Sequence, residues 1–160
     1  MRILIAAIGR AGRGAESTLI DGYCERIRSS GRAVGITRFE IREIDSPKGF
    51  EGDARRRRES TLLADSANPA AKLMVLDERG ENFASEDLAR QIEKMRDHGA
   101  REIAFLIGGA DGHHRSLREK ADLTLAFGRA TFPHMLVRAM LTEQIYRVIT
   151  ILSGHPYHRA

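Results

Sequence analysis

The feature that most constrains the fold is a set of short, nearly continuous apolar runs that occupy residues 3–8, 73–76 and 103–107. Glycine or a charged turn follows each of them. A run of this length without polar alternation is typical of a strand whose two faces are both buried, as in a parallel sheet. We therefore predict three central strands at these positions.

Between these runs, apolar residues recur at helical spacing. Ser85 is the expected N-cap of one such helix, which stops at Gly99. The other predicted helices cover residues 16–28, 52–65, 116–120 and 135–152. Strands that alternate with helices predict an α/β fold, with a mostly parallel sheet and helices on both faces. With 160 residues, we expect a single domain over residues 1–160.

Two further strands are expected from alternating apolar residues. Residues 34–41 alternate with a change of phase in the middle, which predicts a bulged strand. Residues 123–127 alternate regularly and predict a further strand. Asp77 to Gly80 reads as a turn after the strand at 73–76.

Ligands of such folds bind at the carboxyl ends of the strands. Three loops lie there: one after Leu76, one that begins at Gly108, and one between Phe127 and Pro133. The glycines at 108, 109 and 112 lack the dinucleotide spacing G-x-G-x-x-G and no Walker lysine follows. Taken alone, this loop is most simply an ordinary tight turn.

Composition narrows the classes of function. The chain has 26 basic and 22 acidic residues, and only four of the basic ones are lysine. Arginine grips phosphate and stacks on bases, so the excess suits nucleic acid, although arginine-favouring codon usage explains it equally well. For Arg55 to Arg58 we favour a solvated helix face over an RNA-facing patch.

Several chemistries are not expected. Cys24 is the only cysteine, so neither an internal disulfide nor a cysteine zinc site is available. The histidine spacing does not suggest a metal, and no nucleophile motif such as G-x-S-x-G occurs. No apolar run reaches the roughly 18 residues of a membrane span. Because residues 1–5 read as a strand start and no cleavage-type segment follows, we expect a cytoplasmic protein without a membrane partner.

The last predicted helix is apolar over more than half of its circumference, which favours a self-complementary dimer interface. The tail that follows it, residues 154–160, carries an aromatic ring, two imidazoles and a guanidinium, groups that bind RNA. A tail docked on its own domain is the open alternative.

Several motifs occur in the order and spacing of one known family. They are Leu106-Ile107-Gly108-Gly109 with Gly112, Thr131-Phe132-Pro133-His134, Leu136-Val137-Arg138, Glu143-Gln144-Ile145-Tyr146-Arg147 and His155-Pro156-Tyr157-His158-Arg159. Over essentially its whole length the chain thus resembles the ribosomal RNA large subunit methyltransferase H family of the SPOUT class. His113 departs from the family pattern, because an apolar residue is expected there, and residues 128–130 are variable.

The resemblance implies an S-adenosylmethionine-dependent enzyme that methylates N3 of a pseudouridine in large-subunit (23S) ribosomal RNA of the assembled ribosome. It also implies a homodimer, a C-terminal trefoil knot and no DNA partner. The implied cofactor-binding residues are Leu76, Gly108, Phe127, Gly128, Arg129, Ala130, Thr131 and Phe132.

The resemblance also marks the tail as the substrate-binding and catalytic segment, with Tyr157, His158 and Arg159. We expect His158 to act as the base or to orient the acceptor. Arg159 and Arg138 are expected to hold phosphate or the developing negative charge. The tail of one subunit is expected to complete the cofactor pocket of the other.

Two alternatives remain at this point. A non-catalytic ribosome- or RNA-binding protein of the same fold would use the basic surface and the tail equally well. A Rossmann-like nicotinamide enzyme is disfavoured by the glycine spacing.

Overall fold

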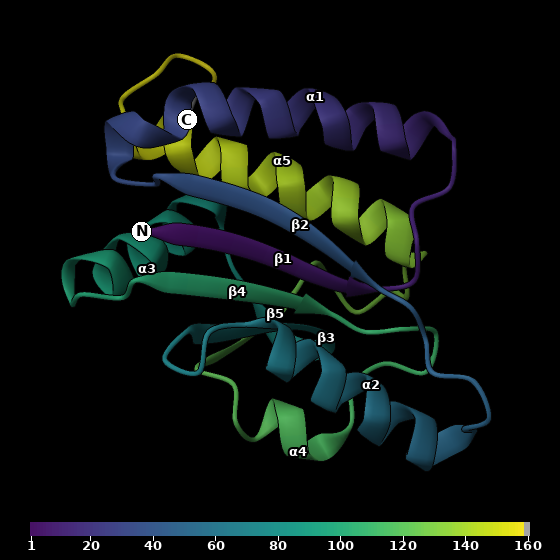
Figure 1. Cartoon of the computed structure of the whole chain (residues 1–160). Coiled ribbons are helices and arrows are strands. Elements are labelled where there is room, and N and C mark those ends of the chain that lie inside the picture. The colour runs from purple at the N-terminus through teal and green to yellow at the C-terminus, as the bar shows by residue number, and fades with distance from the viewer. Residues whose placement is uncertain (159–160) are drawn as a thin grey trace.

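A five-stranded sheet with the order β2-β1-β4-β3-β5 forms the centre of the molecule (Figure 1). The computed structural model describes residues 1–158. All the strand pairs are parallel. The strands are β1 (Arg2–Ile8), β2 (Arg38–Ile44), β3 (Lys72–Asn82), β4 (Glu102–Ile107) and β5 (Leu123–Ala126). The predicted mostly parallel α/β sheet is therefore confirmed.

Helices cover both faces of this sheet, as predicted (Figure 1). One face carries α1 (Ala15–Ser30), α3 (Ser85–Asp97) and α5 (His134–Leu152), and the other carries α2 (Gly52–Ser66) and α4 (Arg115–Arg118). Successive residues of a strand point to opposite faces. In β1, Ile3 and Ile5 accordingly pack under the first group, whereas Leu4 and Ala6 pack under the second. Burial on both sides explains why the central strands have no polar alternation.

The predicted bulged strand over residues 34–41 is wrong in its first half. Gly31–Val34 forms a short 3₁₀ helix, η1, which ends at Gly35 in the left-handed region with φ +79°. Strand β2 begins only at Arg38. Val34 and Ile36 are both buried, although neither lies in a strand. A turn that faces the core therefore produces the same alternation of apolar and polar residues as a strand.

The predicted turn at residues 77–80 is only partly correct. The chain leaves the β3–β5 ladder after Leu76 and returns at Glu81, and both of these residues pair with Leu125. The segment between them is a four-residue bulge inside a longer strand. It places Asp77 at the mouth of a cavity, which is described below.

Ser85 is not the N-cap of α3, because the capping position belongs to Ala84. The Ser85 hydroxyl instead donates to the side-chain oxygen of Gln144 at 2.9 Å and ties α3 to α5. Within residues 1–158, no helix combines the length and apolarity needed to cross a membrane. The trefoil knot that the resemblance implies stays a prediction.

Candidate active site

A cavity of about 1130 Å³ opens where the carboxyl ends of β3, β4 and β5 meet. All three loops that the sequence singled out line it, as the switch-point rule for parallel sheets leads one to expect. Among the predicted cofactor-binding residues, those at the cavity are Leu76, Gly108, Phe127, Gly128, Ala130, Thr131 and Phe132. Arg129 is exposed and does not line the cavity.

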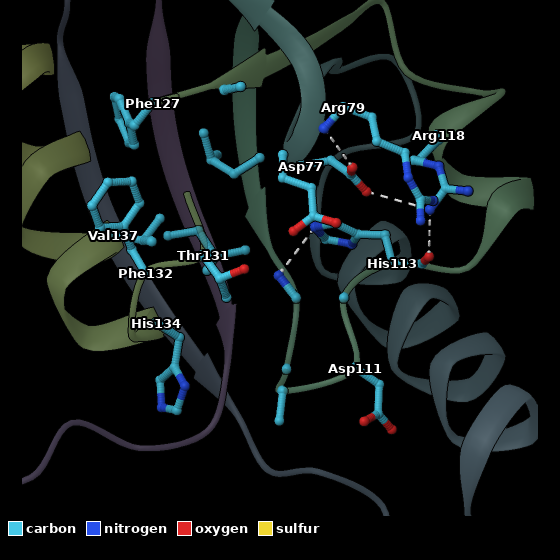
Figure 2. A pocket seen from close by; sticks show the side chains of 18 of the residues that line it. Asp77, Arg79, Asp111, His113, Arg118, Phe127, Thr131, Phe132, His134 and Val137 are labelled. Atoms are coloured by element: carbon cyan, nitrogen blue, oxygen red, sulfur yellow. Dashed lines mark hydrogen bonds and ion pairs between the residues drawn. The ribbon is translucent and has the colours of Figure 1, made fainter. Parts of the chain in front are cut away.

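The two walls of this cavity differ in chemistry (Figure 2). Phe127, Phe132 and Val137 lie on one side and make it largely apolar. Asp77, His113, Arg79, Arg118 and Asp111 lie on the opposite, polar side. An apolar wall facing a few fixed polar groups is the usual arrangement of a small-molecule site.

The floor of the polar side is the glycine loop, residues 108–112. Gly112 has φ +72°, and its amide donates to the Gly109 carbonyl at 3.0 Å. A Cβ atom on Gly109 would lie 2.8 Å from a carboxylate oxygen of Glu59, and one on Gly108 would lie 3.1 Å from the Gly112 carbonyl carbon. The loop is therefore a tight turn, as expected from its glycines, and it also forms a wall of the cavity, as expected for a loop at the end of a parallel strand.

One arginine braces the loops on this side. Arg118 donates from Nη1 to the carbonyl oxygen of His113 at 2.8 Å and to Oδ2 of Asp77 at 3.3 Å (Figure 2). The other Asp77 oxygen accepts the amide of Arg79 at 3.0 Å. These contacts connect the β3 bulge to the glycine loop and to α4. Sequence reasoning missed this brace, because Asp77 is 41 residues away from Arg118 in the chain.

His113 was noted only as a departure from the family pattern, yet it lines the cavity and is 4% exposed. Its Nε2 accepts the amide of Gly108 at 3.1 Å. Burial lowers the pKa of the ring below its usual 6.5, and Asp77 opposes that shift. The imidazole is therefore neutral at physiological pH, with its proton on Nδ1.

The four consecutive arginines of α2 divide into two pairs. Arg55 forms an ion pair with Asp111, and Arg56, which lines the cavity, pairs with Asp53 at 2.9 Å. Arg57 and Arg58 are exposed, and within the described part of the chain no hydrogen bond holds either guanidinium. The predicted solvated face fits Arg57 and Arg58, whereas Arg55 and Arg56 are partly exposed and also form ion pairs.

Arg138 does not reach the cavity within this chain, because its side chain is 1% exposed behind the wall that Val137 helps to form. Its guanidinium donates to Glu43 at 2.9 Å and to the carbonyl oxygens of Ile8 and Gly9 at 2.9 and 2.6 Å. Burial lowers its pKa and Glu43 opposes the shift. A direct substrate contact of Arg138 stays a prediction, while the observed geometry gives it a supporting role at the start of α5.

Up to residue 158, the tail docks on its own domain. The Tyr157 hydroxyl donates to Glu143 at 3.0 Å, and its ring packs edge-on against Tyr146 with 4.8 Å between centroids. Nε2 of His158 lies 2.7 Å from Oε1 of Glu86 at the start of α3. Burial and hydrogen bonds raise the pKa of Tyr157. Arg159 lies outside the described residues.

The cavity is lined by His134 and Val137 at the start of α5, whereas the tail follows the end of this helix (Figure 1). Tyr157 and His158 do not line this cavity, and their side chains contact Glu143 and Glu86 outside it. The structure therefore does not bring either residue to the cavity of the same chain. In residues 1–158, no group of three or more histidine, cysteine or acidic side chains is arranged to hold a metal ion.

Comparison with known proteins identifies the family of this chain. The sequence family described as "Predicted SPOUT methyltransferase" matches residues 1–158. Proteins named ribosomal RNA large subunit methyltransferase H from Mesorhizobium japonicum and Maricaulis maris are each 49% identical, over 100% and 99% of both chains respectively. One from Paracoccus denitrificans is 48% identical over 99% of both chains. The chain therefore belongs to the SPOUT methyltransferase family.

Proposed function

We propose that this chain is an S-adenosylmethionine-dependent methyltransferase that acts on N3 of a pseudouridine in the large-subunit ribosomal RNA of the assembled ribosome. The observation that carries the proposal is the convergence of all three strand-end loops on one cavity in a chain of the SPOUT family. The names of the relatives support ribosomal RNA as the substrate. The choice of N3 and of pseudouridine follows from the motif resemblance.

The cavity suits a nucleoside cofactor. Its volume of about 1130 Å³ is slightly above the roughly 300–1,000 Å³ usual for small-molecule sites. The apolar side, with Leu76 and Phe132, offers surfaces for a flat adenine. A Cβ atom on Gly108 would crowd the backbone of Gly112 in the same loop. The absence of a side chain at this glycine therefore keeps the polar side of the cavity open.

The bound cofactor supplies a methyl group activated by a sulfonium centre. The chain's own contribution is to hold that group in line with the acceptor nitrogen and to exclude water. The backbone of the loop at 127–132 supplies the donors and acceptors for adenine and ribose, so its shape matters more than the side chain of the exposed Arg129.

The position of Tyr157 and His158 outside the cavity of their own chain, on Glu143 and Glu86, supports a composite site in a homodimer. In it, the tail of one subunit completes the cavity of the other. Two large apolar side chains support a dimer surface in the α1 and α5 layer, since Leu19 of α1 is 52% exposed and Leu136 of α5 is 37% exposed.

His158 is the proposed base or orienter. N3 of pseudouridine carries a proton at neutral pH, and a neutral imidazole is the side chain best suited to take it. Arg159 is proposed to hold phosphate or the developing charge on the base, with Tyr157 beside it. Arg138, whose two Nη atoms already donate to Glu43 and to the carbonyl oxygens of Ile8 and Gly9, is proposed to keep the cavity wall in place.

Calorimetric titration tests the cofactor assignment. We expect saturable binding of S-adenosylmethionine and none of NAD, with a dimer mass on the same sample. If the methyl donor fails to bind even with ribosomes present, the methyltransferase assignment falls, and a non-catalytic ribosome-binding protein of the same fold takes its place.

Mixed dimers test the composite site. Thr131→Trp fills the cavity, and His158→Ala removes the proposed base, so each variant alone should lose single-turnover methylation of ribosomes. Co-expressed, the two chains should regain activity, because one site per mixed dimer then combines an intact cavity with an intact tail. If the mixture stays inactive while each variant remains a folded dimer, the tail does not act across the interface.

A further inference from the structure

We propose that His113 is a positioning residue for the cofactor cavity: its neutral ring, with the proton on Nδ1, accepts the Gly108 amide and sets the shape of the glycine loop. The inference rests on the proposed function and adds to it a residue that the motifs do not mark. The sequence pattern in fact calls for an apolar residue here.

The first support is the geometry of the contact itself. A backbone amide can only donate, so Nε2 of His113, 3.1 Å from the Gly108 nitrogen, must be the acceptor and must carry no proton. The proton of the neutral ring then lies on Nδ1. Free imidazole prefers the other tautomer, so the loop imposes this one.

The second support is how little room surrounds the ring. A Cβ atom on Gly108 would lie 3.2 Å from Cε1 of His113, so the ring packs directly on the backbone of the loop. Gly108 and His113 both line the cavity. A shift of the ring therefore moves a wall of the cavity, and displacement by about an ångström near a reacting group is costly.

The third support is that the same residue is held from its other side. Arg118 donates to the His113 carbonyl oxygen and also to Asp77, so backbone and ring are fixed independently. The brace connects three cavity elements: the β3 bulge, the glycine loop and α4. His113 is the point at which the brace meets the loop.

The charged and polar groups around the ring determine whether it is protonated or neutral. Asp77 and the backbone carbonyls of Leu76 and Leu106 favour a proton on the ring, while Arg118 and burial disfavour it. Within residues 1–158, Nδ1 is buried and has no hydrogen-bond partner. A charged ring would place a second N–H against the Gly108 amide, two donors facing each other, and would release the loop.

Two substitutions separate the ring's acceptor from its volume. His113→Leu keeps an apolar side chain of similar size but leaves the Gly108 amide without an acceptor. His113→Gln places a side-chain oxygen at the position of Nε2 and does not titrate. Leu63→Val is the control for a general loss of stability, because Leu63 is a buried residue of α2 that does not line the cavity.

We expect His113→Leu to weaken S-adenosylmethionine binding at least about tenfold. His113→Gln should recover most of the affinity, and Leu63→Val should keep it. Equal affinity of wild type and His113→Leu overturns the proposal. So does a loss in His113→Gln as large as in His113→Leu, because the acceptor would then not be what matters.

The tautomer provides a readout that does not depend on activity. Long-range proton–nitrogen NMR of the free protein should show His113 with its proton on Nδ1. A proton on Nε2, or titration at the ordinary value of 6.5, overturns the contact. If the wild type binds no methyl donor while the Nδ1 tautomer is present, the proposed function fails and the loop contact stands, so the two failures are distinguishable.

Discussion

Gly80 in the β3 bulge lies directly on the backbone of Thr124 in β5: a Cβ atom on this glycine would come within 2.7 Å of the Thr124 carbonyl oxygen. Backbone atoms cannot swing aside as a flexible side chain does. Gly80→Ala should therefore lower the free energy of unfolding by about 1–3 kcal/mol, as overpacking of a filled site does. Urea unfolding followed by circular dichroism measures this.

Gly22 in α1 is the matched control, because a Cβ atom there meets nothing within 4 Å. Gly22→Ala should raise the free energy of unfolding by about 0.5–1 kcal/mol, since alanine restricts the unfolded chain and fits a helix. Destabilisation of similar size by both substitutions would contradict the assigned contact.

Arg138 and Glu43 should behave as a coupled pair. Arg138→Met leaves the carbonyls of Ile8 and Gly9 without their donor and Glu43 without its partner. Because Glu43 is a third exposed and part of its charge is solvated, we expect a loss of about 2–3 kcal/mol.

A double-mutant cycle tests this coupling. Arg138→Met combined with Glu43→Gln should cost clearly less than the sum of the two single changes, as seen for residues in contact. Arg90→Met, at an arginine that is 70% exposed on α3, should change stability by less than about 0.5 kcal/mol. Strict additivity at Arg138 and Glu43 would rule out the supporting role.

Arg57 and Arg58 should contribute to ribosome binding if the exposed side of α2 faces RNA. Neutralising both with Arg57→Gln and Arg58→Gln should reduce the slope of log K against log salt by about 1 to 2, because each phosphate contact releases counterions. Arg28→Gln with Arg90→Gln, which removes two charges from the opposite face, should leave the slope unchanged. Equal slopes for all three proteins would identify the α2 pair as a solvated face.

His113 should make stability depend on pH. Folding lowers its pKa, so below its ordinary 6.5 the unfolded chain binds more protons than the folded one. The stability that the neutral ring contributes is therefore complete above that pH and decreases as the pH falls towards the folded-state value. His113→Gln lacks this proton uptake. Urea unfolding between about pH 8 and pH 5 should show wild type losing stability more steeply than the variant, and parallel curves would contradict the neutral buried ring.

Much of the fold was predictable from local pattern. The central strands appear as apolar runs because both of their faces are covered, and the helices appear through 3.6-residue spacing and a glycine stop such as Gly99. The predictions of local structure were wrong where a different backbone conformation buries the same side chains. Val34 and Ile36 face the core from a 3₁₀ turn, and Ser85 bonds Gln144 instead of capping its own helix.

The candidate site was predictable to the level of its loops. A parallel sheet must collect the carboxyl ends of its strands at one edge, so the loops after Leu76, Gly108 and Phe127 were expected to meet. The family resemblance added the cofactor-binding residues, and among these eight Arg129 alone does not line the cavity. Which polar side chains brace those loops was not predictable, because Asp77 and Arg118 are 41 residues apart and no local pattern records their contact.

The sequence by itself determined the parallel α/β architecture, the three converging loops and the family, because apolar periodicity and motif spacing are properties of neighbouring residues. Only the tertiary structure decided that His113 is a buried acceptor, that Arg138 is held by Glu43, and that the tail docks outside its own cavity. The physical reason is that burial and the pairing of polar groups depend on which distant segments the core brings together. A histidine or an arginine has the same letter in the sequence whether it faces water, a backbone amide or a carboxylate.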